Sequence, residues 1–312
     1  MKKIFVCAMA LAAFAACQKN EVVEMPQGTA IAFNTFVDKS TKVTEDEDMS
    51  TANLKEFTLY GWRTTGEATQ QIFDKQAVTV AGGVCTYSPL QYWQNGYTYQ
   101  FEAVSPKIGD ALAVTPAVGG SKLTFTSDSN TDLVWARPTE VAYVAAQTAP
   151  APVHLTFQHL LSRVMFRVHN QFPENAAAKI TVKSIIINAA ADKAELDMSA
   201  ETPAWAPVAD ETADVTFVTD GMANIAAGGN YADTEHQYMI PADLTTVTLV
   251  YELDQNGVKN EYTATKALTG DPNLFLAIGR SLRINVVLNE KNVDPDNELF
   301  PIEFTASVGV WE

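Results

Sequence analysis

Hydrophobic residues recur at every second position along most of the chain, which is the spacing of β-strands with one buried face. The first clear case is segment 29–37, where Ile31, Phe33 and Val37 share one side. Similar runs rich in β-branched and aromatic residues predict strands at 54–62, 97–101, 123–126, 153–157, 161–168, 180–187, 215–218, 247–253, 262–265, 281–288 and 302–310. Segments 173–179 and 273–278 are the only helical candidates, with a turn or two each.

Turn residues separate these strands and indicate how the chain is organised. Asn256-Gly257 lies between two strong strands and is the best short hairpin signal. Many short strands without regular helical partners predict an all-β fold of sandwiches. The length favours two domains, and the Ala- and Pro-rich segment 145–152 is a candidate link. We place the boundary near His159, giving an N-terminal domain at 29–158 and a C-terminal domain at 159–312.

The N-terminus has the layout of a secretory signal. Two lysines precede an apolar run that ends at Ala16, and the run is too short to cross a bilayer. Phe14-Ala15-Ala16-Cys17 resembles a bacterial lipobox, which predicts a signal peptide at 1–16, lipidation of Cys17 and a tether at 17–28. Ordinary secretion with an incidental Cys17 is the alternative. Lipidation would fix the chain at the outer membrane through its acyl (palmitate-type) chains.

Charge and cysteine content exclude several classes of partner. The formal charge is −16, and it becomes −18 once Lys2 and Lys3 leave with the signal. This acidic balance argues against nucleic acid and against binding anionic membranes by charge. After lipidation of Cys17 only Cys85 remains, so neither an intrachain disulfide nor a cysteine zinc site is expected. We interpret Cys85 as a small core residue.

The sequence contains no recognisable constellation for catalysis. It has no nucleophile elbow, phosphate loop or dinucleotide fingerprint, so we expect neither an enzyme nor a bound cofactor. The four histidines do not match metal spacing, and His154 and His159 should point to opposite faces of a strand. Segments 128–132 and 294–298 space oxygen ligands as a calcium loop does, but both are incomplete. We therefore expect no metal.

The five tryptophans raise the possibility of sugar binding, because flat indole rings stack on sugars. On strands, a tryptophan is usually a core residue. Trp135 and Trp205 fall in segments that we interpret as loops, so they are the candidates for exposure.

Short motifs along the chain, taken in order, resemble the fimbrillin-like (Mfa-like) family. They are Ile31-Ala32-Phe33, Thr41-Lys42-Val43-Thr44, Leu54 to Gly61, Tyr87 to Trp93, Asp132 to Ala136, Leu155 to Val164, Tyr238 to Pro241 and Ile278-Gly279-Arg280. The resemblance implies two tandem transthyretin-like β-sandwich domains in a surface lipoprotein that serves as a subunit of type V pili. It also implies assembly by β-augmentation, in which a strand from another subunit replaces an N-terminal strand removed by a protease.

Under this resemblance, the displaced strand is 29–37, with Ile31, Phe33 and Val37 facing inward. The donor strand is 302–310, whose alternating face consists of Ile302, Phe304, Ala306, Val308 and Val310. The alternative is that 302–310 is simply the last strand of its own domain.

Processing is the point at which the sequence departs from the family. Pilins of the family are typically matured by an arginine-directed protease, yet no arginine precedes Arg63, so Lys39 and Lys42 are the candidate cleavage sites. If the first strand is retained, the protein is instead an anchor, a terminal subunit or a stand-alone adhesin. Expected partners are other fimbrial subunits and surface glycans or proteins of host or bacterial cells. The rival functions are a glycan-binding surface lipoprotein that does not polymerise and, more distantly, a β-sandwich hydrolase.

Overall fold

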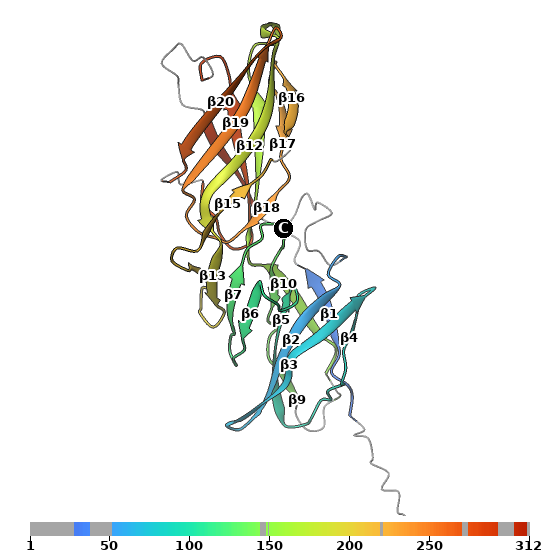
Figure 1. Cartoon of the computed structure of the whole chain (residues 1–312). Coiled ribbons are helices and arrows are strands. Elements are labelled where there is room, and N and C mark those ends of the chain that lie inside the picture. Colours follow the sequence, from blue (N-terminus) through green and yellow to red (C-terminus); the bar gives the residue numbers. More distant parts are fainter. Residues whose placement is uncertain are drawn as a thin grey trace, which may run out of the picture.

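The protein is described from a computed structural model that covers residues 28–37, 52–143, 148, 150–218, 221–269, 274–292 and 303–310. Within 303–310 it describes the backbone and, of the side chains, only that of Thr305. These parts of the chain form 22 strands and one short 3-10 helix, η1 (Glu174–Ala176). The predicted all-β fold is therefore confirmed. The molecule is elongated, with one lobe at each end and a smaller sheet between them (Figure 1).

The first lobe is built from one curled sheet of eight strands. In spatial order they are β1 (Phe33–Val37), β10 (Val153–His159), β8 (Val134–Ala136), β5 (Tyr97–Ser105), β2 (Glu56–Thr65), β3 (Ala68–Ala81) and β4 (Val84–Thr86), with β9 (Val141–Tyr143) also paired to β5. Its aromatic core is tight at Gly61, where a Cβ would lie 2.8 Å from the Phe73 ring and 2.9 Å from the Phe101 ring. Only glycine fits there without displacing one of the rings.

The second lobe consists of two sheets whose inner faces share one hydrophobic core. One sheet contains β17 (Asn230–Asp233), β11 (Ser162–Asn170), β21 (Arg280–Leu288) and β22 (Glu303–Val310), with β18 (Gln237–Met239) also on β11. The other contains β15 (Thr212–Thr216), β12 (Ala178–Ala191), β19 (Thr246–Gln255) and β20 (Val258–Ala267), with β16 (Met222–Ala226) also on β12. The predicted hairpin is confirmed, because Asn256 and Gly257 have φ of 55° and 84° and join β19 to β20.

A four-stranded sheet connects the lobes. Its order is β14 (Trp205–Pro207), β13 (Lys193–Asp197), β7 (Lys122–Thr126) and β6 (Leu112–Thr115), so it combines strands from both sides of His159. These strands surround a separate core that also contains Leu133, Leu160 and Leu161. The lobes therefore meet through packed side chains and not through a bare linker, and the domain boundary proposed at 158/159 stays a prediction.

Several local predictions need correction. Trp205 was expected to be exposed in a loop, but it lies in β14 at 8% exposure and its indole N–H donates to the Leu160 carbonyl at 2.8 Å. Trp135 lies in β8 and is half-buried. Both tryptophans lie in strands of three residues, which are too short to be recognised from alternating apolar positions. The helix predicted at 273–278 is absent from the described residues 274–278. The short helix predicted at 173–179 is present as the single turn η1, after which β12 begins at Ala178.

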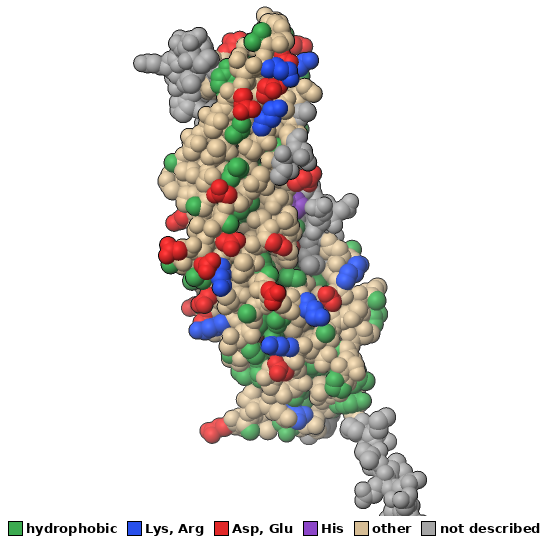
Figure 2. Space-filling model, in the orientation of Figure 1, with side chains coloured by type: hydrophobic (Ala, Val, Ile, Leu, Met, Phe, Trp, Pro, Cys, Tyr) green, Lys and Arg blue, Asp and Glu red, His purple; other side chains and the backbone are tan. Residues whose placement is uncertain are grey.

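Cys85 matches its interpretation as a small residue at the core, since it is half-buried against the first-lobe core. Among the described residues, no helix is long and apolar enough to cross a membrane. On the face shown in Figure 2, lysines and arginines are interspersed with acidic residues and do not gather into a basic patch.

Candidate assembly interface

The strand expected to be displaced, β1, is anchored by one buried face. Ile31, Phe33 and Val37 are exposed by only 1%, 5% and 1%, as their alternation predicts. The Phe33 ring lies edge-on to the rings of Phe101 at 5.3 Å and Phe73 at 5.8 Å. Edge-to-face aromatic pairs of this kind add to the area that the ring buries. Phe33 is therefore the main anchor of β1.

The backbone of this segment closes the curled sheet. β1 runs parallel to β10, from Phe33↔Val153 to Val37↔Phe157. Just before β1, the Ile31 N–H donates to the Gln91 carbonyl at 2.9 Å, so the segment also bonds to the chain that follows β4. The Tyr87 hydroxyl adds a bond of 2.6 Å to the Ile31 carbonyl. Removing this segment would leave unpaired backbone groups both on β10 and on the chain that follows β4.

The size of that loss follows from burial. Each fully buried Ile, Phe or Val side chain contributes about 1.5–3 kcal/mol, so Ile31 together with Phe33 and Val37 of β1 contributes roughly 5–9 kcal/mol. The whole free energy of unfolding of a typical domain is about 5–15 kcal/mol. A lobe without β1 would keep an apolar groove and a free strand edge on β10, both of which favour binding of another strand.

The outward face of β1 carries a second set of contacts. Asn34 Oδ1 lies 2.7 Å from His154 Nδ1, and the half-exposed Phe36 ring stacks on the His154 ring at 6.5 Å. His154 is exposed and His159 is buried, which confirms that they point to opposite faces of their strand. His159 Nδ1 lies 2.8 Å from Asp132 Oδ2, forming a buried pair. Asp132 and His159 are 27 residues apart in the chain, and no local spacing predicts that they pair.

The candidate donor segment lies in the second lobe. Its described part, β22, pairs antiparallel with β21 from Arg280↔Val310 to Val287↔Glu303 and is the last strand of its sheet. Phe304, Ala306, Val308 and Val310 therefore lie in a strand. Four candidate positions fall outside the described residues: Cys17, Lys39, Lys42 and Ile302.

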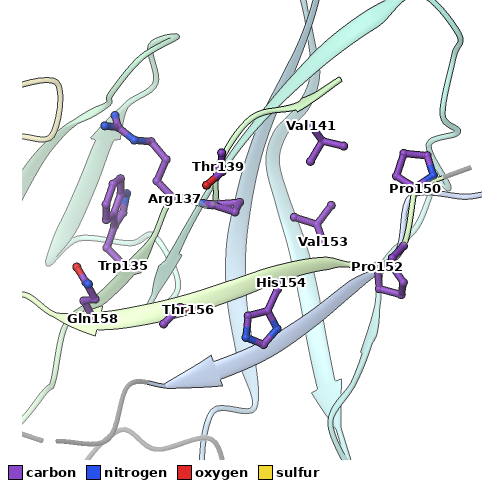
Figure 3. A pocket seen from close by; sticks show the side chains of 12 residues that line it. Trp135, Arg137, Thr139, Val141, Pro150, Pro152, Val153, His154, Thr156 and Gln158 are labelled. Carbon is purple, nitrogen blue, oxygen red and sulfur yellow. The ribbon is translucent and has the colours of Figure 1, made fainter. Parts of the chain in front are cut away.

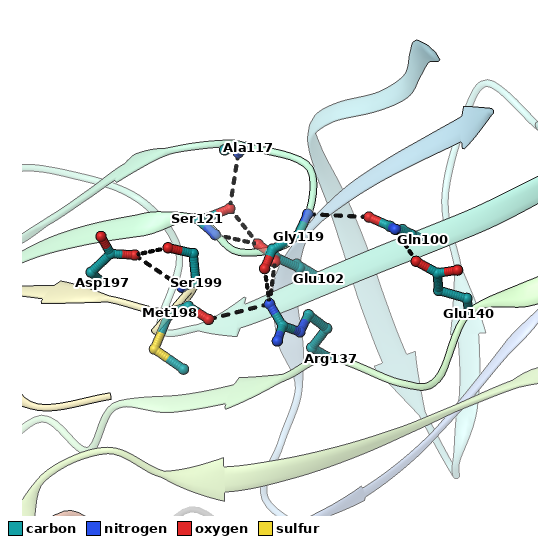
Figure 4. A network of polar contacts seen from close by, with 10 residues as sticks. All are labelled: Gln100, Glu102, Ala117, Gly119, Ser121, Arg137, Glu140, Asp197, Met198 and Ser199. Carbon is teal, nitrogen blue, oxygen red and sulfur yellow. Dashed lines mark hydrogen bonds and ion pairs between the residues drawn. The ribbon is translucent and has the colours of Figure 1, made fainter. Parts of the chain in front are cut away.

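A buried carboxylate that the sequence analysis missed links the first lobe to the central sheet (Figure 4). Glu102 on β5 is 2% exposed and accepts hydrogen bonds from the backbone N–H of Ser121, at 3.2 Å, and from its hydroxyl. Arg137 lies 3.7 Å away and also donates to the carbonyls of Gly119 and Met198. Burial raises the pKa of Glu102, and its hydrogen bonds and Arg137 only partly offset this.

The carboxylate oxygens of the loop at 128–132 form hydrogen bonds with other groups of the protein. The Asp128 carboxylate accepts from the backbone N–H groups of Asn130 and Thr131 at 2.9 and 2.7 Å, as an ordinary Asx turn does. Asp132 is turned toward His159. Within the described residues, no three His, Cys, Asp or Glu side chains come together as metal ligands would. The loop at 294–298 lies outside the described residues.

Comparison with known proteins identifies a family for this chain. Residues 41–308 match the sequence profile of a family described as fimbrillin-like. A putative cell adhesion protein from Bacteroides uniformis has a TM-score of 0.52 at 14% identity, covering 91% of this chain and 99% of that one. One from Bacteroides ovatus has a TM-score of 0.51 at 12% identity, covering 91% and 98%. A fimbrial anchor protein from Porphyromonas gingivalis has a TM-score of 0.40 at 11% identity, covering 91% of this chain and 98% of that one. No curated protein matches the chain.

Proposed function

Because the chain belongs to the fimbrillin-like family, we propose that it is a lipid-anchored fimbrial subunit or accessory adhesin that assembles by exchanging a β-strand between protomers. The family consists of fimbrial and adhesin-type surface proteins, which act through structure and not through catalysis. The finer part of the proposal is the exchange itself, in which β1 leaves the first lobe and segment 302–310 of a second copy takes its place.

The observation that carries this proposal is a match between the two segments. Along β1 and the two residues before it, the inward positions read Ile31, Phe33, Thr35 and Val37. Alternate positions of the donor segment read Ile302, Phe304, Ala306 and Val308 in the same order. Three of the four residues are identical, and the fourth is small in both segments. A groove shaped by the first set would therefore accept the second.

The match also indicates the direction and register that we propose for the exchange. If Phe304 enters the site of Phe33, the donor pairs with β10 in parallel, as β1 does. Backbone hydrogen bonds to β10 then supply adhesion, while the large Phe site sets the register. The donor leaves β21 of its own chain, where it is the last strand and has only one described strand partner.

Processing would link this exchange to the lipid anchor. Lys39 and Lys42 follow β1 directly, so cleavage at either would separate β1, together with Cys17, from the rest of the chain. The cut protein would lose its lipid as its groove opens. An uncut protein would stay anchored at the outer membrane with the groove filled, as an anchor or terminal subunit would.

Treatment with a lysine-specific protease, followed by electrophoresis without denaturant, tests the proposal. We expect a ladder of oligomers once the cut segment is allowed to dissociate. A chain carrying Lys39→Arg and Lys42→Arg resists this enzyme at both sites and should remain monomeric. Deleting 301–312 should abolish the ladder, and Phe304→Ala should shorten it, whereas Thr305→Ala, at an exposed position, should not. A cut protein that stays monomeric would contradict the building-block role.

A further inference from the structure

The first-lobe sheet is split along one of its internal strand pairs. β8 and β10 pair only at Gln158↔Trp135 and His159↔Val134. Beyond these pairs, no backbone hydrogen bond among the described residues joins segment 137–141 to segment 153–156. The two segments diverge and enclose an open pocket of about 570 Å³ (Figure 3). We name this opening between 135–141 and 150–158 the β8–β10 cleft.

One wall of the cleft is an unused strand edge. In a parallel ladder, alternate residues direct both backbone groups toward the same neighbour. The Val153 N–H donates to the Ala32 carbonyl at 2.8 Å, so the odd-numbered residues of β10 face β1. His154 and Thr156 therefore direct their N–H and C=O groups into the cleft. The backbone groups of His154 and those of Thr156 are about 6.4–6.8 Å apart, which is the spacing of alternate residues in an extended chain.

The other wall is held away from this edge by its own contacts. Pro138 has no N–H to donate across the gap. Its neighbour Arg137 is fixed on the far side by the carbonyls of Gly119 and Met198 and by the carboxylate of Glu102 (Figure 4). The wall cannot close onto β10 without breaking these bonds. The cleft is therefore held open by specific contacts of the fold.

The chemistry of the lining points to the kind of occupant. Val141 and Val153 line the cleft between the two walls (Figure 3), and prolines 150 and 152 flank one end. Among the described residues, no Asp or Glu contributes to the lining, although the chain is strongly acidic. A row of backbone donors and acceptors beside apolar side chains suits an added strand better than a sugar ring. The absence of acidic side chains from this lining disfavours a basic ligand.

We propose that the β8–β10 cleft receives an extended, neutral or acidic segment of a partner polypeptide, which pairs as an added strand with His154 and Thr156. This site uses the edge of β10 opposite to β1. It is therefore open in the uncut protein and does not depend on strand exchange. A fimbrial subunit with a filled groove could bind a second protein there.

Amide hydrogen exchange measured by NMR on the full mature chain tests the unused edge. We expect the amides of His154 and Thr156 to exchange at least about 100-fold faster than those of Leu155 and Phe157, which are bonded to β1. Equal protection of all four amides would overturn the proposal, because the edge would then already be occupied.

Selection from a displayed library of random nine-residue peptides tests the occupant, with synthetic copies of the selected peptides measured by calorimetry. Binding should protect the amides of His154 and Thr156. Thr156→Pro removes the N–H needed by the ligand and should weaken binding at least about 10-fold, whereas Thr156→Val keeps it and should bind as the wild type does. If Thr156→Pro also makes the Leu155 amide exchange faster, the proline has disturbed the pairing of β10 with β1. In that case Thr139→Trp, which fills the cleft, is used instead and should abolish binding.

Three outcomes would contradict the proposal. The library yields no binder, the selected peptides bind the blocked variant as well as the wild type, or a panel of oligosaccharides shifts the cleft resonances while no peptide does.

Discussion

Replacing Phe33 by alanine tests how β1 is held. The ring is 5% exposed and meets three aromatic rings at 5.3 to 5.9 Å, namely Phe73, Tyr87 and Phe101. Removing a buried phenylalanine costs about 3–5 kcal/mol, because contacts are lost and a cavity remains. β1 is an end strand, so this cost falls mainly on its local dissociation from β10. Since about 1.4 kcal/mol is a factor of ten, the opening equilibrium should rise roughly 1000-fold.

Phe36 offers a matched control on the same strand. Its ring is 39% exposed on the outward face and its described ring contact is the stack on His154. Phe36→Ala should therefore cost less than about 1 kcal/mol. The assay is hydrogen exchange at the amides of Leu155 and Phe157, which are protected only while β1 is docked. Equal acceleration in the two variants, or none in Phe33→Ala, would refute the assignment of Phe33 as the anchor.

Three further predictions concern other parts of the fold. Since burial raises the pKa of Glu102, the folded state holds its proton more tightly than the unfolded state, so stability falls as pH rises from the unfolded pKa through the folded one. Denaturant titrations of Glu102→Gln should lack this fall, so its stability relative to wild type should rise with pH over that range. Gly120→Ala should lower the melting temperature strongly, since φ is +143° and a Cβ would lie 2.4 Å from the Ser199 backbone. Asn170→Ala should cost about 2–3 kcal/mol in denaturant titration, because the buried amide donates to two backbone carbonyls.

The fold could be predicted from the sequence wherever apolar and polar side chains alternate regularly over several residues. β10 and β21 alternate without interruption between buried and less buried positions, so their strands were recognised and the faces of β10 were assigned correctly. The short strands β8 and β14 have three residues each, and no period can be recognised over that length. That is why Trp135 and Trp205 were placed in loops.

The site was predictable only in part, for a related reason. β1 was found because its inward residues are apolar and alternate. The Glu102 network and the β8–β10 cleft depend on contacts between residues far apart in the chain. Glu102 meets Arg137 because β8 pairs with β5 in the first-lobe sheet, and it meets Ser121 because the start of β7, in the central sheet, packs beside β5. No local spacing encodes either contact. Likewise, the cleft arises where a ladder stops, which depends on Pro138 and the anchoring of Arg137.

The most direct test of strand exchange is the binding of a synthetic peptide of residues 302–312 to a chain that lacks 301–312. The chain is cut at Lys39 or Lys42, freed of its N-terminal segment, and titrated with the peptide by calorimetry. The account predicts saturable binding with one peptide per chain, competition by a peptide of residues 29–37, and weaker binding when Phe304 is replaced by alanine. It also predicts no binding to the uncut chain, whose groove β1 fills. Failure to bind the cut chain, or equal binding to cut and uncut chains, would contradict it.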